Sequence, residues 1–258
     1  MPHVQQHSPG SFNWLELGTT DQKAAQEFYG QLLGWQPRDF PMRRNFNYTM
    51  FLLNGRMVSG CYPIQQGQPA SPHWDLYVAV DNADETAARA AELGGVVLQP
   101  PADVVTFGRK AVIQDPTGAV FSVWQAKEHI GVRIAGEHGA LCWADLNTPG
   151  RLRAKEFYEA LFGWQLVPGK DKTVDSYLHI VNGEAYIGGI LPDSQRDKNA
   201  PPHWLIYFQV TDCDVSTAKA QELGAQVHMP PVSIENAVRY SVLADPQGAV
   251  FALFTGRV

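Results

Sequence analysis

The first predicted element is a β-strand, because hydrophobic and polar residues alternate through NWLELGT at residues 13–19. In residues 22–33 the apolar positions instead recur at a spacing close to 3.6, which predicts an amphipathic helix that ends at Gly34. Two strands are predicted in residues 48–62, and Asn54-Gly55 between them is typical of a hairpin turn.

The second quarter of the chain follows the same plan. Residues 75–80 predict a strand, residues 84–93 a helix that ends at Gly94, and residues 110–124 two further strands. The turn between the last two is Asp115-Pro116-Thr117-Gly118, whose residues suit a type I turn. We therefore predict an α+β fold of four strand–helix–strand–strand–strand units, with helices outside and curved sheets inside.

The second half of the chain repeats the first at an offset of 129 or 130 residues. The recurring pairs are Trp14 and Trp143, Tyr29 and Tyr158, Trp35 and Trp164, His73 and His203, Trp74 and Trp204, Arg109 and Arg239, and Asp115 and Asp245. Such a period is too long for a solenoid and indicates a duplicated domain. We predict one domain at residues 11–126, a linker at 127–138 and a second domain at 139–256.

Composition narrows the range of partners. A formal net charge of −6 argues against nucleic acid or an anionic membrane as the partner. No run of 18 apolar residues is present, and residues 1–10 lack the features of a signal peptide, so a cytoplasmic protein is expected. Cys61, Cys142 and Cys213 are odd in number and far apart, which favours reduced thiols over disulfides.

Two sequence blocks carry a family resemblance. They are FYGQLLGW at residues 28–35 with its copy FYEALFGW at 157–164, and DPTGAVFSVW at 115–124 with its copy DPQGAVFALF at 245–254. They resemble the vicinal oxygen chelate superfamily of glyoxalase I, bleomycin-resistance proteins and extradiol dioxygenases, and within it an actinobacterial-type branch of tandem glyoxalase-like proteins often named hydroxylases. The resemblance implies glyoxalase-like domains whose paired units curl into a cup-shaped sheet around a small-molecule site.

The resemblance also implies four metal-ligand positions, one on each of four strands. They fall on Trp14 and Trp143, near Gly60 and Gly188, on Asp75 and Leu205, and on Ser122 and Ala252. Only Asp75 could bind a metal, so we expect neither a metal nor another cofactor. His73 and His203 stand two residues before the third position, either as displaced ligands or, as we favour for isolated histidines, bonded to backbone.

Side chains two apart on a strand share a face, which predicts the lining of each cup. Glu16 would accompany Trp14 and is a candidate general base, Tyr77 would accompany Asp75, and Tyr48 is a further candidate. In the second repeat the ligand-binding candidates are Trp143, Tyr207 and His179, of which His179 has no histidine at its counterpart position, and the corresponding base is Asp145. Such aromatic walls suit a planar organic ligand.

Two sets of recurring residues leave alternatives open. Arg109 and Arg239 could clamp an anionic or carbonyl oxygen beside Glu16 and Asp145, or each could form an acid–arginine pair that ties adjacent strands. Trp14, Trp143 and the pair Trp74 and Trp204 could be pocket wall or core.

The function favoured by these patterns is metal-free binding of an aromatic or polyketide-like small molecule, by a monomer or homodimer. The alternative is a metal-independent or partner-assisted enzyme, hydroxylase-like or lyase-like, on a carbonyl or polyketide-type substrate. A metal-dependent glyoxalase or dioxygenase is disfavoured because the predicted ligand positions lack donors.

Overall fold

The computed structural model describes residues 4–43, 46–65, 67, 70–170, 173, 175–234 and 238–256. Across this part of the chain, no helix has the length and apolar character needed to span a membrane. The elements of the first domain are β1 (Phe12–Thr19), α1 (Gln22–Leu33), β2 (Gln36–Arg43), β3 (Phe46–Leu53), β4 (Arg56–Pro63), β5 (His73–Ala79), α2 (Ala83–Glu92), β6 (Val96–Val104), β7 (Gly108–Gln114) and β8 (Val120–Ala126).

The second domain repeats this order. Its elements are β9 (Leu141–Asn147), α3 (Arg151–Phe162), β10 (Gln165–Pro168), β11 (Leu178–Asn182), β12 (Ala185–Ile190), β13 (His203–Gln209), α4 (Cys213–Glu222), β14 (Gln226–Ile234), β15 (Val238–Ala244) and β16 (Val250–Thr255).

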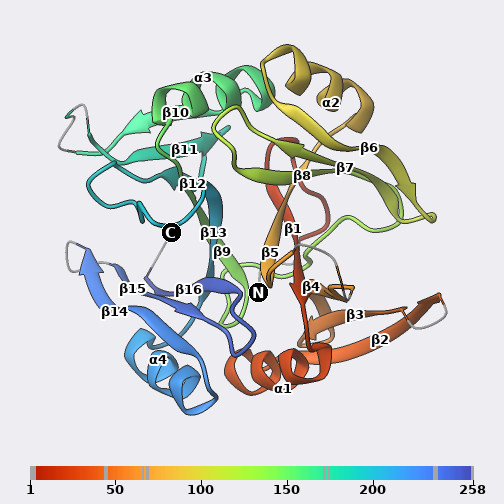
Figure 1. The fold of residues 1–258 in the computed structure, drawn as a ribbon, viewed down its shortest axis with the longest axis vertical. Helices are drawn as coiled ribbons and strands as arrows, with labels where there is room; N and C mark the ends of the chain where they lie inside the picture. Colours follow the sequence, from red (N-terminus) through yellow and green to blue (C-terminus); the bar gives the residue numbers. More distant parts are fainter. Residues whose placement is uncertain are drawn as a thin grey trace.

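Each domain forms one mixed eight-stranded sheet, ordered β2-β3-β4-β1-β5-β8-β7-β6 in the first and β10-β11-β12-β9-β13-β16-β15-β14 in the second. Both sheets are curved, and their convex backs meet at the centre of the molecule, so that the concave faces open to opposite sides (Figure 1). We name these concave faces cup 1 and cup 2. The predicted fold class, four repeated units in two tandem α+β domains, is confirmed.

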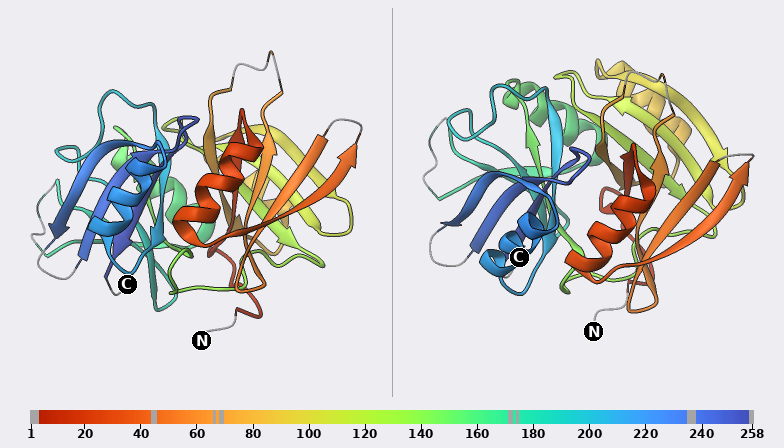
Figure 2. Two further views of the ribbon diagram at one scale, coloured as in Figure 1. Left: turned by 90° about the horizontal axis from the view of Figure 1, so that it is seen from below. Right: turned by 60° about the horizontal axis from the view of Figure 1, so that its bottom comes forward.

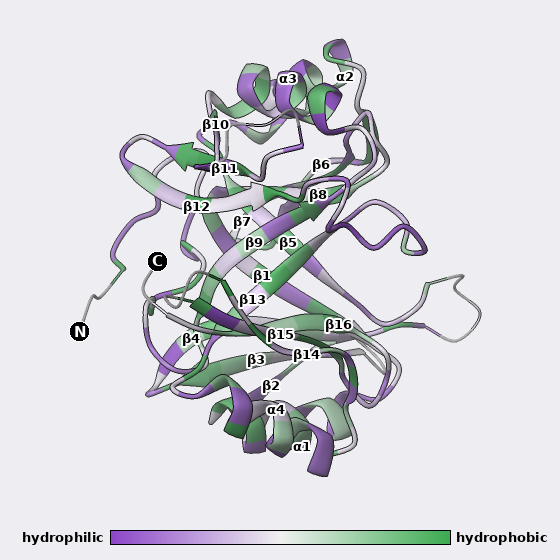
Figure 3. Ribbon diagram, turned by 90° about the vertical axis from the view of Figure 1, so that its left-hand side faces the viewer, coloured by the Kyte–Doolittle hydropathy of each residue, from purple (hydrophilic) through white to green (hydrophobic). Residues whose placement is uncertain are grey.

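The helices lie in pairs, α1 beside α4 and α2 beside α3, so each pair joins the two domains (Figures 1 and 2). Viewed from the open side of cup 2, one pair lies above the sheets and the other below (Figure 3). The sequence sets the ends of α1: the Asp21 side chain accepts a hydrogen bond from the Ala24 N–H, and Gly34 closes the helix at φ 74°.

A reciprocal set of buried hydrogen bonds joins the domains. The Tyr29 hydroxyl donates to Asp245 Oδ2 at 3.0 Å, and the Tyr158 hydroxyl donates to Asp115 Oδ2 at 2.9 Å. The indole N–H groups of Trp74 and Trp204 donate to these tyrosine oxygens, each at 3.2 Å. These two tryptophans are therefore core residues on the convex side and not pocket wall.

Two further tryptophans link each domain to the segment that leads into the other. The Trp35 indole donates to the Gly139 carbonyl before β9, and the Trp164 indole donates to the Gly10 carbonyl before β1, both at 2.8 Å. The residues that recur between the repeats are thus largely the residues that hold the two domains together.

Candidate functional site

Strand register brings several of the predicted residues together in cup 1. Glu16 on β1 lies beside Asp75 on β5 and Gly60 on β4, while Trp14 lies beside Tyr77. Residues paired across neighbouring strands have side chains on the same face. The first repeat therefore carries its predicted carboxylates and aromatic rings on one concave surface.

A hydrogen-bonded polar cluster occupies the floor of cup 1. The Tyr48 hydroxyl donates to Glu16 Oε1 at 2.7 Å, and the Tyr77 hydroxyl donates to Glu16 Oε2. Lys110 Nζ lies 3.3 Å from Glu16 Oε2 and also donates to the Tyr77 oxygen. Burial, reinforced by the Glu16 charge, raises the pKa of both tyrosines well above the usual range, so both act as neutral donors.

Tyr48 lies directly over Gly60, near which the resemblance placed one metal ligand. A Cβ atom at Gly60 would lie only 1.8 Å from the Tyr48 oxygen. In cup 2 the equivalent residue is Gly189, which pairs with Asp145, and not the expected Gly188, which pairs with Ala144; a Cβ atom at Gly189 would lie 1.9 Å from the Tyr177 oxygen. In both cups, then, a tyrosine ring fills the space that a ligand side chain on β4 or β12 would need.

The end of cup 1 near the start of β5 holds a second polar cluster. The Tyr62 hydroxyl donates to Asp75 Oδ2 at 2.8 Å and lies 3.1 Å from His73 Nε2. Burial opposes ionisation of Asp75, but His73, Lys110 and Tyr62 outweigh it and hold its pKa below the usual range. His73 Nδ1 bonds the Ser71 carbonyl at 2.7 Å, and His203 Nδ1 bonds that of Pro201 at 2.8 Å, as the backbone interpretation predicts. His73 is not isolated, however, because its Nε2 lies 3.6 Å from Asp75 Oδ1.

The opposite end of cup 1 is covered by the segment between the domains. Val132 packs with Trp14, Tyr77 and Trp124, and His129 lies edge-on to Trp14 with ring centroids 4.5 Å apart. Trp14 is only 3% exposed, so it belongs to the wall of the cup and to a small core at the same time. Burial lowers the pKa of His129 to about 4, so its imidazole is neutral near pH 7.

Cup 2 has the same plan with a different polar content. Asp145 accepts hydrogen bonds from Tyr177, from Trp143 Nε1 at 3.0 Å and from Tyr207 at 2.7 Å, and it is 4% exposed. Burial raises the pKa of Asp145 despite these donors. His179 lies beside Tyr177, with ring centroids 4.8 Å apart.

Three positions distinguish the cups. At an offset of 130, Asp75 corresponds to Leu205 and Lys110 to Tyr240, and at 129 Tyr62 corresponds to Leu191. Cup 2 therefore lacks the lysine and, of the second polar cluster, keeps only the histidine, His203.

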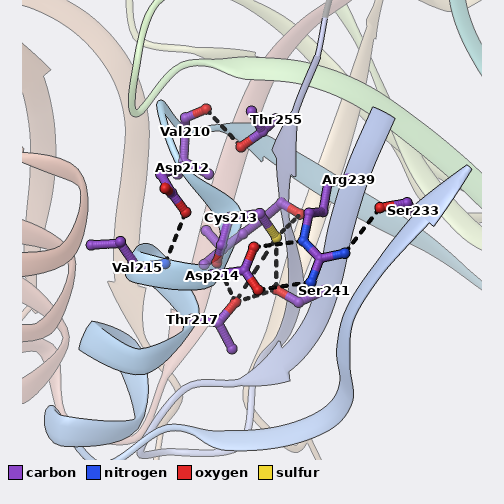
Figure 4. Close-up of polar contacts among 11 residues, drawn as sticks. Val210, Asp212, Cys213, Asp214, Val215, Thr217, Ser233, Arg239, Ser241 and Thr255 are labelled. Carbon is purple, nitrogen blue, oxygen red and sulfur yellow. Dashed lines mark hydrogen bonds and ion pairs between the residues drawn. The ribbon is translucent and has the colours of Figure 1, made fainter. Parts of the chain in front are cut away.

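The structure does not bring the two predicted arginines into the cups. Arg109 pairs with Asp84 on α2, at 2.6 and 2.8 Å, and Arg239 pairs with Asp214 on α4, at 2.5 and 2.7 Å (Figure 4). Each arginine ties a strand to the helix outside it, so no arginine clamp forms beside Glu16 or Asp145. The reason is the alternation of the strand, which directs Arg109 outward and Lys110 inward.

The four metal-ligand positions of the fold do not fit a metal ion in either cup. Apart from Asp75, these positions carry only indole, glycine, alkyl and hydroxyl groups. Asp75 itself accepts a hydrogen bond from Tyr62. Among the described residues, no three His, Cys, Asp or Glu side chains are placed to hold a metal.

The comparisons with known proteins agree with this architecture. Residues 14–124 match the family model described as glyoxalase-like domain, and residues 143–253 match that of the glyoxalase/bleomycin resistance protein/dioxygenase superfamily. The chain belongs to the vicinal oxygen chelate superfamily, as a tandem protein of two such domains. This confirms the resemblance drawn from the two sequence blocks.

Relatives match over nearly the full chain. A protein of Mycobacterium tuberculosis named "Putative glyoxylase CFP32" is 38% identical, over 98% of this chain and 97% of its own. The anthracycline biosynthesis protein DnrV of Streptomyces peucetius is 33% identical, over 95% of this chain and 93% of its own. Among solved structures, a Mn(II)-bound glyoxalase from Novosphingobium aromaticivorans has a TM-score of 0.66 at 18% identity, over 96% of this chain and 82% of that one, which shows a shared fold.

Proposed function

We propose that this protein binds one small aromatic molecule per chain, of the polyketide type, on the floor of cup 1 and without a metal ion. The observation that carries the proposal is the difference between the two carboxylates. Each carboxylate accepts hydrogen bonds from three donors, but Asp145 is only 4% exposed, whereas the Glu16 side chain is 15% exposed and one of its donors is a lysine whose side chain is 22% exposed. Cup 1 therefore offers both a hydrogen-bond acceptor and a cation to a ligand.

The chemistry of the floor defines the ligand class. Trp14 and Trp124, which are 3% and 5% exposed, form an apolar backing beside the floor, and Glu16, Tyr77 and Lys110 supply an acceptor next to donors. An aromatic ring system with adjacent hydroxyl and ketone oxygens presents the complementary pattern. The kinship with a protein named for anthracycline biosynthesis supports this class.

The test uses 1,2-dihydroxyanthraquinone as the probe and tryptophan fluorescence as the readout. We expect quenching that saturates at one probe per chain. Tyr77→Phe and Lys110→Met should each weaken binding about tenfold, since a hydrogen bond to a charged or buried group contributes about 1.5 kcal/mol.

The second repeat supplies the matched control. Tyr207→Phe makes the same change in cup 2, so it should leave the affinity unchanged while the circular dichroism of both variants stays that of the parent protein. Equal weakening by Tyr207→Phe and Tyr77→Phe, or no saturable binding at all, would contradict the proposal.

A metal-independent or partner-assisted enzyme, hydroxylase-like or lyase-like, on a carbonyl or polyketide-type substrate is the second candidate. It is favoured by the continuous bonding of Lys110, Tyr77 and Glu16, which could hold and move a proton at the Glu16 carboxylate. Conversion of a bound hydroxyanthraquinone, followed by chromatography and abolished in Glu16→Gln, would support catalysis. Recovery of the unchanged compound would leave binding as the function.

A further inference from the structure

A cleft of about 400 Å³ lies on the arm of cup 1 built from β2, β3 and β4. It is lined by three arginines and by apolar side chains, chiefly Arg38, Arg56, Arg133, Phe40, Met50 and Met57. Arg133 belongs to the segment between the domains, and its own backbone N–H donates to the Met57 carbonyl at 3.0 Å. The cleft is thus assembled from both the sheet and the interdomain segment.

The arginines of this cleft have no acidic partner within the part of the chain that the structure describes. Arg109, Arg151, Arg196 and Arg239 each form an ion pair, whereas none involves Arg38, Arg56 or Arg133. The Arg38 guanidinium instead lies 5.3 Å from the centroid of the Phe40 ring. Three unneutralised cations at one cleft are notable in a protein of net charge −6.

Arg133 is also incompletely hydrogen-bonded. Its Nε is buried, and no partner for this atom is present among the described residues. A buried donor left unpaired raises the free energy of the folded state, and an anion that accepts this hydrogen bond removes that cost. A carboxylate or phosphate accepts from a guanidinium in a paired geometry that neutral oxygens do not match.

The second repeat lacks these charges. At an offset of 129, Val167 corresponds to Arg38 and Ala185 to Arg56. Arg38 and Arg56 therefore occur in cup 1 only, and the second domain adopts the same fold without them.

The cleft borders the apolar cluster beside the floor of cup 1. Met50 and Met57 line the cleft and also pack against the cluster of Trp14, Tyr77 and Trp124. We propose that Arg38, Arg56 and Arg133 bind an anionic group, a carboxylate or phosphate, carried by the aromatic ligand of cup 1. This inference rests on the proposed function, which supplies the aromatic part of the ligand. It adds that the ligand also carries a negative charge.

The experiment compares anthraquinone-2-carboxylate with its neutral amide, anthraquinone-2-carboxamide, by isothermal titration calorimetry. We expect the carboxylate to bind at least tenfold more tightly, with an affinity that falls as salt rises from 50 to 500 mM (about two-thirds of the Debye length is lost over that range). Arg38→Gln and Arg133→Gln should each remove most of this preference and leave the amide affinity unchanged. Arg38 is exposed, so its variant is informative even if Arg133→Gln proves unstable.

Arg89→Gln is the control for a simple loss of charge, because Arg89 pairs with Glu92 on α2. Equal binding of carboxylate and amide, or an equal effect of Arg89→Gln and Arg38→Gln, would overturn the inference and leave aromatic binding in cup 1 intact. If Arg38→Gln reduces the preference for the carboxylate but Tyr77→Phe leaves the affinity for both compounds unchanged, the result would support the anion site and contradict the floor site. Failure of both anthraquinones to bind would contradict both proposals.

Discussion

At the scale of single residues, the contact between Gly60 and Tyr48 is the tightest constraint in cup 1. Gly60→Ala would place a methyl group 1.8 Å from the Tyr48 oxygen, so the tyrosine must leave its bond to Glu16. We expect this substitution to cost about 1–3 kcal/mol of unfolding free energy, measured by urea denaturation.

A double-mutant cycle separates this contact from a general intolerance of alanine in the strand. In a Tyr48→Ala background the ring is absent, and Gly60→Ala should then cost less than half as much. An unchanged cost in that background would show that the ring is not the cause.

The His73 and Asp75 pair should make stability depend on pH. The hydrogen bond to Asp75 raises the pKa of His73, so this contribution is complete below the unfolded pKa of about 6.5 and is lost as pH rises through the folded value. Asp75 has a lowered pKa, so its contribution is lost as pH falls through that value. The pair should therefore stabilise most between about pH 4.5 and 6.

His73→Gln should accordingly destabilise more at pH 5.5 than at pH 8.5, by a few tenths of a kcal/mol because the imidazole is partly exposed. His203→Gln is the matched variant, since Leu205 stands where Asp75 stands in the first repeat. Denaturation midpoints for both variants at both pH values provide the measurement, and an equal pH dependence would contradict the assignment to Asp75.

Single residues also show where sequence interpretation succeeded and failed. Alternation along β1 and β5 was sufficient to place Glu16 with Trp14 and Asp75 with Tyr77 on one face. Arg109 was predicted to line the cup because it recurs as Arg239, and this was wrong. The alternation of the strand places its neighbour Lys110 in the cup instead. The useful signal was the difference between Lys110 and Tyr240, because recurring residues mostly serve the shared fold.

At the scale of elements, helix α2 offers a direct test of local stability. The Asn82 side chain accepts hydrogen bonds from the N–H groups of Asp84 and Glu85 at 3.0 and 3.1 Å. Asn82→Ala should lower the unfolding free energy by about 1 kcal/mol, whereas Asn82→Asp, which keeps the acceptor, should change it little. Equal urea midpoints for the alanine and aspartate variants would show that this cap contributes nothing.

The outer strands were the elements least accessible from sequence. β2 contains Pro37 and Pro41, and β6 contains Pro100 and Pro101, so neither segment has the alternation of a regular strand. Both lie at a sheet edge, where a missing N–H is tolerated, and both have register shifts. The inner strands, which alternate cleanly, were located within a few residues.

At the scale of the whole molecule, the reciprocal tyrosine bonds should make the two domains unfold together. Tyr29→Phe and Tyr158→Phe each leave a buried carboxylate with one donor fewer, at an expected cost of about 1–3 kcal/mol. Calorimetry should show one transition in the parent protein, with equal calorimetric and van't Hoff enthalpies. Two separated transitions would contradict the coupling.

Metal content is the second test at this scale. Protein purified without chelator or a histidine tag should contain well below one equivalent of iron, zinc, nickel or manganese by elemental mass spectrometry, because the donor positions do not fit a metal. One equivalent would overturn this expectation and direct mutagenesis to Glu16, His73 and Asp75.

The duplication was evident from sequence, but the way in which the copies assemble was not. Periodicity reports which face of an element is apolar, and it does not identify the partner element. The hydrogen bonds from Tyr29 to Asp245 and from Trp35 to Gly139 join residues more than 100 positions apart. Only the folded chain shows that a recurring tyrosine of each repeat binds the recurring aspartate of the other, Tyr29 to Asp245 and Tyr158 to Asp115.

Because the reciprocal bonds lie behind both sheets, the residues that join the two domains differ from those that line the concave faces. The concave clusters around Trp14 and around Tyr207 have no member in common and face away from each other. Substitutions that alter the specificity of one cup should therefore be tolerated by the other. The chain is in this sense a single frame with two concave surfaces that can vary independently, and a ligand specificity engineered into cup 2 should leave cup 1 undisturbed.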